Sequence, residues 1–309
     1  MQVTNTILMI RPVGFRMNEQ TAVNNFFQED LDIKNAEINL KAQKEFDGFA
    51  EILKSKGINV IVVNDTNEPD TPDSIFPNNW ISFHENGTVG LYPMFAENRR
   101  DERREDVLDI LENHGFIIND IVDYTSAEED GFFLEGTGSI LLDRINKKAY
   151  CALSDRADEE LFIEFCEDFD YFPVVFTANQ SVDGKRMPIY HTNVMMCLGE
   201  TFSVICSDAI DNKKERKIVL DHLNNDGKEI IRISEKQMHQ FAGNMLQVLG
   251  KDNKRYLVMS SSAYNSLTQE QIKSLTKYSE IIHSSLETIE ACGGGSARCM
   301  MAEIFLPKK

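Results

Sequence analysis

LKAQKEFDGFAEILKSKGINVIVV, residues 40–63, contains the unit from which the architecture can be inferred. Apolar residues recur at helical spacing between Phe46 and Leu53, Gly57 follows them, and residues 58–63 form a mainly apolar run. Glycine is the usual residue just beyond the end of a helix, and a short apolar run after it is typical of a buried strand. The segment therefore predicts a helix that ends at Gly57 and leads directly into a strand.

The same order of helix, glycine and strand recurs along the chain. It is found around Gly115 and Gly227, which lie 58 residues (57 to 115) and 112 residues (115 to 227) further on. A period of about 56 residues predicts further copies near positions 171 and 283, where helical patterns without the glycine also precede apolar runs. The predicted strands are residues 58–63, 116–118, 174–176, 229–233 and 281–282. A fixed period of this length indicates a repeat architecture.

Pairs of strand-like segments lie between the copies. Residues 80–83 and 89–94 flank Asn86-Gly87, and residues 139–142 and 149–153 flank a short polar turn, which predicts two hairpins. Each module is then of ββαβ type, and a single module cannot bury its own sheet. The sequence therefore predicts an α/β fold in which five modules close around a pseudo-fivefold axis, as one catalytic domain over residues 1–309. The alternative is an ordinary α/β domain with a coincidental spacing.

Composition excludes several classes of function. The chain of 309 residues carries a formal charge of −18, which disfavours binding to nucleic acid or to an anionic membrane surface. No apolar run reaches the roughly 18 residues that a membrane span requires. The six cysteines contain no Cys-x-x-Cys pair and predict reduced thiols in a cytoplasmic protein, with five of them filling the core.

Three segments combine reactive side chains with glycine or polar turns. Glu135 follows an apolar run and precedes Gly-Thr-Gly, so it is expected at the end of a strand. His191 is expected to open an apolar strand, which would place Asn193 on the same face. Cys299 follows the run Gly293–Gly295 and is expected at the start of a further strand over Met300–Leu306.

A cysteine, a histidine and a glutamate in such positions suit a thiol nucleophile, a general acid/base and an orienting carboxylate. A protease or an acyltransferase could use the same three groups. A metal site is disfavoured, because Cys292, Cys299 and His191 lack the local spacing of zinc ligands.

The three segments resemble motifs of the guanidine-modifying enzymes of the pentein superfamily. The matching segments are FLEGTGS (133–139), YHTN (190–193) and GGGSARCM (293–300). The resemblance extends from Asp73 to Cys299 with glutamate, histidine and cysteine in the family's order. It implies a five-bladed α/β propeller, which agrees with the fivefold repeat.

The resemblance also implies roles for the three reactive residues. Cys299 would attack the central carbon of a guanidino or ureido group and form a covalent adduct. His191 would protonate the departing nitrogen and then deprotonate water, and Glu135 would hold a substrate nitrogen. No metal ion or organic cofactor is implied.

Two positions depart from the relatives that act on a guanidinium. Those enzymes commonly place carboxylates where this chain has Asn79 and Asn193. A neutral ureido group needs both a donor and an acceptor, and an Asn amide provides both. The two substitutions therefore favour citrulline over arginine. The pattern also resembles the citrulline-hydrolysing, amidinotransferase-like branch of the superfamily, which implies hydrolysis of citrulline to ornithine, ammonia and carbon dioxide. Asp73 is retained and could hold a substrate nitrogen, so an arginine deiminase, a dimethylarginine hydrolase and an amidinotransferase remain alternatives.

Two arginines are candidates for binding the substrate carboxylate. Arg99 and Arg156 lie in segments that resemble those of the family's carboxylate-binding arginines, and a guanidinium can donate two parallel hydrogen bonds. Solvated side chains at a helix start are the alternative for Arg99.

The expected partner is a small molecule, with no nucleic acid and no membrane, and homo-oligomerisation stays open. A binding protein of the same fold is the non-enzymatic alternative. The acidic charge and the three reactive residues argue against it.

Overall fold

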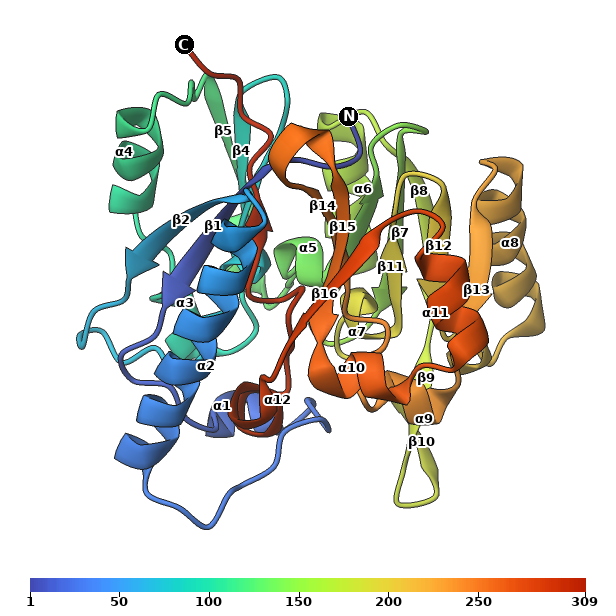
Figure 1. Cartoon of the computed structure of the whole chain (residues 1–309), viewed down its shortest axis with the longest axis horizontal. Helices are drawn as coiled ribbons and strands as arrows, with labels where there is room; N and C mark the ends of the chain where they lie inside the picture. Colours follow the sequence, from blue (N-terminus) through green and yellow to red (C-terminus); the bar gives the residue numbers. More distant parts are fainter.

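The computed structural model describes residues 1–309 and contains five three-stranded sheets of identical strand order (Figure 1). In each sheet the middle strand pairs antiparallel with the first strand and parallel with the third. The sheets are β17-β1-β2 (Ala302–Glu303, Thr6–Arg11, Asn59–Asn64), β3-β4-β5 (Ile81–Phe83, Thr88–Leu91, Asp120–Asp123), β6-β7-β8 (Ile140–Asp143, Lys148–Leu153, Phe172–Thr177), β11-β12-β13 (Met196–Leu198, Phe202–Ile205, Glu229–Arg232) and β14-β15-β16 (Leu246–Leu249, Arg255–Ser260, Glu280–Ser284). The α/β class and the five repeated modules are confirmed.

The two ends of the chain meet in one sheet. β17, near the C-terminus, pairs antiparallel with β1, near the N-terminus, with Leu8 opposite Ala302. First strands of different sheets also pack together, namely β17 with β3, β6 with β11, and β11 with β14. A further hairpin, β9 (Asn179–Val182) and β10 (Lys185–Pro188), projects from the lower edge in Figure 1.

Helices connect the second and third strands of the sheets and add short turns elsewhere. They are α1 (Glu19–Ala22), α2 (Asn35–Ser55), α3 (Glu97–Arg100), α4 (Asp106–Asn113), α5 (Gly136–Ser139), α6 (Glu159–Asp168), α7 (Thr192–Met195), α8 (Lys213–Asn225), α9 (Glu235–Met238), α10 (Ser261–Ser266), α11 (Gln269–Leu275) and α12 (Glu287–Gly293). The longest, α2, buries Phe46, Phe49 and Leu53 against β1 and β2, as its helical spacing predicts. The one-turn helices α5 and α7 contact each other in the middle of the molecule (Figure 1).

The turns that end the repeated helices share one backbone conformation. Gly57, Gly115 and Gly227 have φ between 72° and 83°, in the left-handed region that glycine enters without strain. In the third copy along the chain Asp170 takes this position with φ 56°. Aspartate is one of the few other residues that tolerate this region, so the repeat continues there without its glycine.

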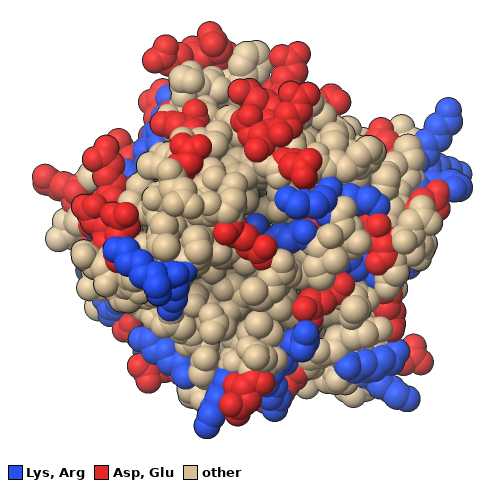
Figure 2. Space-filling model, turned by 90° about the horizontal axis from the view of Figure 1, so that it is seen from above, with Lys and Arg blue, Asp and Glu red and all other residues tan.

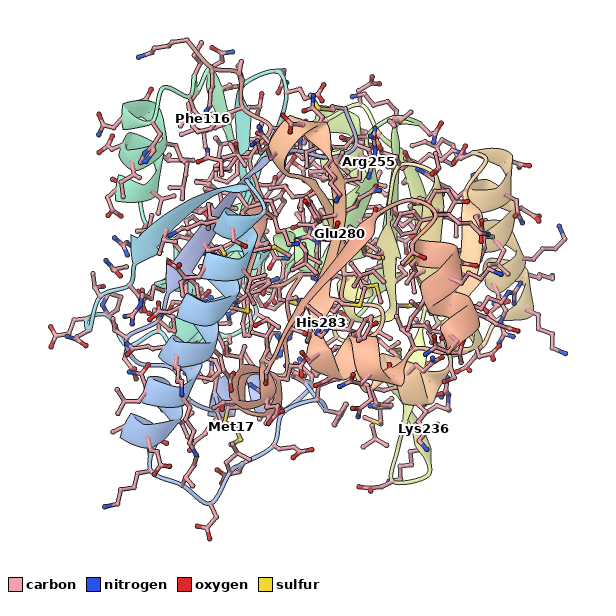
Figure 3. All side chains as sticks on the ribbon, in the orientation of Figure 1. Met17, Phe116, Lys236, Arg255, Glu280 and His283 are labelled. Carbon is pink, nitrogen blue, oxygen red and sulfur yellow. The ribbon has the colours of Figure 1, made fainter.

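One of the five strands predicted from the repeat is misplaced. After Gly115 the strand β5 occupies Asp120–Asp123, whereas residues 116–118 were expected. Phe116, labelled in Figure 3, instead forms a bridge with Lys308, and the N–H of Ile117 donates to Pro307. Backbone hydrogen bonds with the C-terminal tail therefore replace those that a strand over residues 116–118 would have made with its own sheet.

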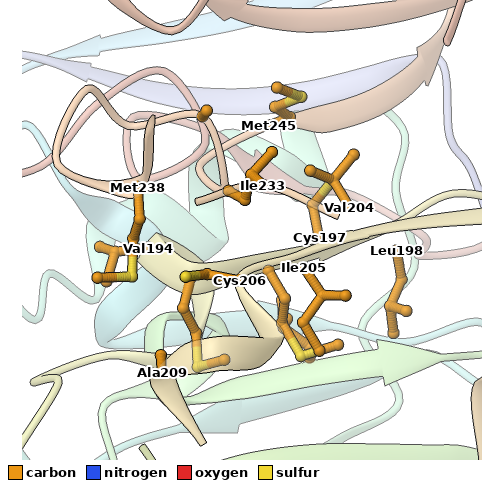
Figure 4. Close-up of a cluster of buried hydrophobic side chains, with 14 of the residues drawn as sticks. Val194, Cys197, Leu198, Val204, Ile205, Cys206, Ala209, Ile233, Met238 and Met245 are labelled. Carbon is orange, nitrogen blue, oxygen red and sulfur yellow. The ribbon is translucent and has the colours of Figure 1, made fainter. Parts of the chain in front are cut away.

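The core consists of several apolar clusters. Figure 4 shows part of the largest, in which Val194 lies beside Met238 and Cys197 lies beside Val204. Cys151, Cys166, Cys197, Cys206 and Cys292 are buried and unpaired, so the prediction that five cysteines fill the core is confirmed. Acidic and basic side chains are interspersed on the face in Figure 2. None of the helices is both long enough and apolar enough to cross a membrane.

Candidate active site

A cavity of about 240 Å³ lies where the three reactive segments meet. It is lined by Asn25, Asp73, Phe76, Asn79, Arg99, Arg156, Tyr190, His191, Gly293, Gly295 and Cys299. Glu135 and Asn193 lie directly behind this lining. Glu135 forms a hydrogen bond with His191, and Asn193 forms one with Cys299. The structure thus brings together all eight residues that the sequence singled out.

The reactive side chains lie on turns and not on strands. His191 immediately precedes α7, Glu135 immediately precedes α5, and Cys299 lies in a turn before β17. The expected strand at His191 and the expected strand over Met300–Leu306 are therefore wrong at these points. Short helical turns aim successive side chains in different directions, which is how neighbouring residues reach different partners in the cavity.

Cys299 is held between two amides. Its Sγ accepts from Nδ2 of Asn244 at 3.2 Å and from Nδ2 of Asn193 at 3.5 Å. Oδ1 of Asn244 accepts from the backbone N–H of Arg298 at 2.9 Å, which fixes the amide with its donor toward the sulfur. Two N–H donors stabilise negative charge that develops on the sulfur or on an oxygen bound beside it.

The glycine run before Cys299 allows close packing of this loop. A Cβ at Gly293 or Gly295 would lie 2.8–2.9 Å from the ring of Phe76, and one at Gly294 would lie 2.5 Å from Asn25. Only glycine fits against these groups without moving them, which explains the three consecutive glycines.

His191 and Glu135 form a buried pair. Nε2 of His191 lies 2.7 Å from Oε2 of Glu135. Burial acts to raise the pKa of Glu135, but the guanidinium of Arg156, the hydrogen bond from His191 and Arg99 outweigh it and hold that pKa well below its usual range. Burial lowers the pKa of His191 to about 4, against the opposing effect of Glu135. The histidine is therefore neutral near pH 7, with its hydrogen on Nε2 and the proton-accepting lone pair on Nδ1.

Asp73 lines the cavity with one carboxylate oxygen that is free to accept a hydrogen bond. Its Oδ2 accepts from Asn18 at 2.8 Å and from Thr21 at 3.2 Å, whereas its buried Oδ1 has no partner. Burial raises the pKa of Asp73, and Arg99 and Arg156 oppose this shift. An unpartnered buried oxygen is costly, so a substrate N–H is the expected occupant.

The two candidate arginines are buried and differ in what they bind. Arg99 donates Nε and Nη2 to the carboxylate of Glu102 at 2.8 and 2.9 Å, and Nη1 to Oδ1 of Asn79 at 3.0 Å. Arg156 donates Nε and Nη2 to Oδ1 of Asn24 at 2.9 and 2.5 Å. The side of Arg99 that a substrate carboxylate would use is thus occupied by Glu102. The solvated alternative for Arg99 is excluded, since only 2% of the residue is exposed.

Two contributors to the site were not selected from the sequence. Glu102 lies three residues after Arg99 in a charged helical segment, and this i,i+3 spacing was a usable signal. Asn244 has no sequence signal of comparable strength. It reaches Cys299 because Gly243 approaches the backbone of Val194 closely, where a Cβ would lie 2.3 Å from the carbonyl oxygen.

The lowered pKa of His191 predicts a pH-dependent stability. Unfolded His191 binds a proton below about pH 6.5, and folded His191 does so only below about pH 4, so protonation favours the unfolded state between these values. We expect the free energy of unfolding to fall by about 2 kcal/mol from this residue between pH 7 and pH 5. Urea unfolding at both pH values should show a smaller drop for His191→Gln than for the wild type.

His114, an exposed histidine, supplies the matched control. His114→Gln should retain the drop of the wild type. An equal drop in His191→Gln would show that the buried imidazole does not titrate as inferred.

Comparison with known proteins identifies a family and a set of solved structures. The family model for N,N dimethylarginine dimethylhydrolase, eukaryotic, matches residues 11–306. No curated protein matches the sequence.

The solved structures share the fold at low sequence identity. The apo structure of ArgZ, an arginine dihydrolase of cyanobacteria, has a TM-score of 0.73 at 17% identity, covering 98% of this chain and 41% of that one. The N-terminal domain of ArgZ bound to substrate has a TM-score of 0.70 at 17% identity, covering 97% of both chains. A dimethylarginine dimethylaminohydrolase has a TM-score of 0.66 at 12% identity, covering 98% of this chain and 100% of that one. This chain thus spans about two fifths of full-length ArgZ and matches its N-terminal domain throughout.

Proposed function

We propose a function from the premise that this chain belongs to the N,N dimethylarginine dimethylhydrolase family, within the pentein superfamily. It is a cysteine-dependent hydrolase that breaks C–N bonds at the ureido or guanidino carbon of a small amino acid derived from arginine. Its substrate is citrulline, and its products are ornithine, ammonia and carbon dioxide.

The observation that carries this proposal is the neutral amide on each side of the reaction centre. Asn193 contacts the sulfur of Cys299, and Asn79 lines the same cavity. The carboxylate of Glu135 is occupied, because Oε2 lies against His191 and Oε1 accepts from the N–H of Phe95 at 3.1 Å. A guanidinium would therefore meet only one free carboxylate oxygen, on Asp73, whereas a ureido group is neutral and meets donors and acceptors.

Each group has a defined step in the reaction. Sγ of Cys299 bonds to the ureido carbon as its proton passes to Nδ1 of His191. The histidine returns that proton to the departing nitrogen, which leaves a thiocarbamate on the sulfur. It then deprotonates water, which attacks the same carbon and releases the thiol and a carbamate. Loss of carbon dioxide from the carbamate completes the balance: citrulline and one water give ornithine, ammonia and carbon dioxide.

The amino-acid end of the substrate is assigned to Arg156 and Asp73. Nη1 of Arg156 makes no hydrogen bond and lies 3.6 Å from Glu135, so this face of the guanidinium can receive a carboxylate. Oδ1 of Asp73 can accept from an ammonium or from the terminal nitrogen of the ureido group. Arg99 was a second candidate for the carboxylate, and its contact with Glu102 favours Arg156 instead.

Arginine is the second candidate substrate, supported by the charge of the site. Three buried carboxylates, on Asp73, Glu102 and Glu135, face two buried guanidiniums, on Arg99 and Arg156. With all three carboxylates ionised and His191 neutral, one further cation would balance this set; burial raises the pKa of Glu102 to about 8 and also raises that of Asp73, which weakens this demand. The fold relative ArgZ is described as an arginine dihydrolase, and another, AgrE, was solved with ornithine and NAD⁺. Arginine would then pass through citrulline in the same site and consume a second water.

The proposal also includes the arrangement of the five sheets and the domain organisation of the chain. We infer that the five sheets surround a common axis as the blades of a propeller, and that residues 1–309 form one catalytic domain without a metal ion or organic cofactor. The contacts between first strands of different sheets support this arrangement. Cytoplasmic location and homo-oligomerisation stay predictions.

Parallel incubations of the purified protein with citrulline and with arginine test the substrate. Mass spectrometry should detect ornithine from citrulline, with a kcat/KM at least tenfold above that for arginine. Asn79→Asp should reduce this preference, because it adds a carboxylate where a guanidinium would lie. Formation of citrulline from arginine without ornithine would contradict the proposal and favour a deiminase. Turnover of methylated arginines alone would favour a dimethylarginine hydrolase.

A further inference from the structure

Glu102 and Arg99 form a pair that the reaction scheme above does not use. Glu102 is 3% exposed, and its two oxygens accept from Nε and Nη2 of Arg99. A bidentate contact of this kind fixes both the position and the plane of the guanidinium. Arg99 is also 3.6 Å from Glu135 and 3.9 Å from Asp73, so three carboxylates compete for it.

The orientation of Asn79 follows from this pair. A guanidinium only donates hydrogen bonds, so the atom of Asn79 that faces Nη1 of Arg99 at 3.0 Å must be its oxygen. Nδ2 therefore points the other way, where it donates to Oδ1 of Asn78 at 3.2 Å. One N–H of Nδ2 is left without a protein partner.

The position of this amide nitrogen is fixed from a second direction. A Cβ at Gly138 would lie 2.4 Å from Nδ2 of Asn79 and 2.8 Å from the imidazole of His191. The nitrogen and the imidazole thus both pack against the backbone at Gly138, and both residues line the cavity with Cys299. The free N–H therefore belongs to a donor that lies near the imidazole of His191.

We propose that Glu102 is a positioning residue that acts through Arg99 to hold Asn79 with its N–H toward the reaction centre, and that this selects a substrate with an acceptor there. A ureido oxygen is such an acceptor. A guanidinium presents only N–H groups to the same donor and is disfavoured. This inference rests on the proposed function, and the fixed orientation of Asn79 is the reason that the site prefers a ureido group.

The two acceptor oxygens of Glu102 explain why the position needs a carboxyl group. Burial raises the pKa of Glu102 to about 8 against the opposing effect of Arg99, so its geometry, more than its charge, sets its role. A glutamine offers one acceptor in place of two, so Arg99 would be drawn toward Glu135 and Asp73, which lie within 4 Å, and its contact with Asn79 would be lost. The amide could then rotate and present its oxygen to the cavity, which suits a guanidinium better than a ureido group.

A double-mutant cycle tests whether Glu102 acts through Asn79. Steady-state kinetics with citrulline and arginine would be measured for the wild type, Glu102→Gln, Asn79→Ala and the double variant. We expect Glu102→Gln to lower kcat for citrulline by about 10- to 100-fold with a smaller change in KM. Its kcat/KM for arginine should be retained or rise, and in the Asn79→Ala background the substitution should change citrulline turnover by less than about threefold.

Asp106→Asn is the matched control, because Asp106 forms a similar bidentate pair with Arg104 on the exposed side of the molecule. It should retain the kinetics of the wild type. Glu102→Asp keeps the charge and should keep more citrulline activity than Glu102→Gln. If Glu102→Gln does not fold, the same cycle is run with Glu102→Asp.

Several results would overturn the inference. Equal losses on citrulline and arginine, or full additivity with Asn79→Ala, would mean that Glu102 only stabilises the fold. Wild-type kinetics in Glu102→Gln would exclude any positioning role while the proposed function stands. Absence of citrulline turnover in the wild type itself would instead remove the proposed function, and with it this inference.

Discussion

Cys299→Ala is expected to lower the turnover of citrulline by about 10⁴-fold or more, because no other group in the cavity can form the covalent bond to the ureido carbon. The cavity should remain intact, since the substitution removes one sulfur atom and leaves the backbone hydrogen bond from Cys299 to Ser296 in place. Mass spectrometry of ornithine formation would measure the loss. Iodoacetamide labelling followed by peptide mapping should show alkylation of Cys299 in the wild type, in step with the loss of activity.

Cys292→Ala is the matched control for this prediction. Cys292 precedes the same glycine run and is fully buried, and burial raises the pKa of its thiol to about 11. This variant should retain turnover and the labelling of Cys299. If Cys292→Ala were inactive and Cys299→Ala active, the assignment of the nucleophile would be reversed.

Gly138→Ala is expected to lower kcat/KM for citrulline by about 100-fold, the second large effect. Its new Cβ would lie 2.4 Å from Nδ2 of Asn79 and 2.8 Å from the ring of His191, well inside normal contact distances. Both groups would have to move, and displacement of about 1 Å in a catalytic group can cost this much in rate. Kinetics and thermal unfolding measured together separate this displacement from a loss of folded protein.

Gly48→Ala is the matched control for Gly138→Ala, because here the same substitution is expected to leave activity unchanged. Gly48 lies on the exposed side of α2, and a Cβ there has no heavy atom within 4 Å. The substitution should leave kcat/KM unchanged and raise stability by about 0.5–1 kcal/mol, because alanine favours a helix interior. If Gly138→Ala kept the activity of Gly48→Ala, the close approach at Gly138 would have no role in positioning the site.

Much of the fold could be predicted because its signals are local. The helix before Gly57 and the strand after it follow from the spacing of apolar side chains and from one left-handed turn. The third repeat along the chain, whose glycine is replaced by Asp170, could be found only from the period of the others. The strand after Gly115 was placed too early because Phe116 pairs with the distant C-terminal tail.

The site was predictable in its members and less so in its geometry. His191 and Cys299 were expected to open strands, yet they lie at short turns, since runs such as Val194–Leu198 look alike whether a helical turn precedes the strand or not. Asn244 was missed because its place beside the sulfur depends on the packing of Gly243 against another sheet.

The sequence by itself determined the repeated α/β module and the set of residues that carry reactive groups, because residue type and spacing act over a few positions. Only the tertiary structure decided which partner each of these groups has. It paired β17 with β1, which lie at opposite ends of the chain. It also placed the guanidinium of Arg99 in hydrogen-bonding contact with Glu102 and Asn79. It also left one oxygen of Asp73 free in the cavity. Buried charges and amides must satisfy every donor and acceptor at once, and that balance exists only when distant segments are packed together.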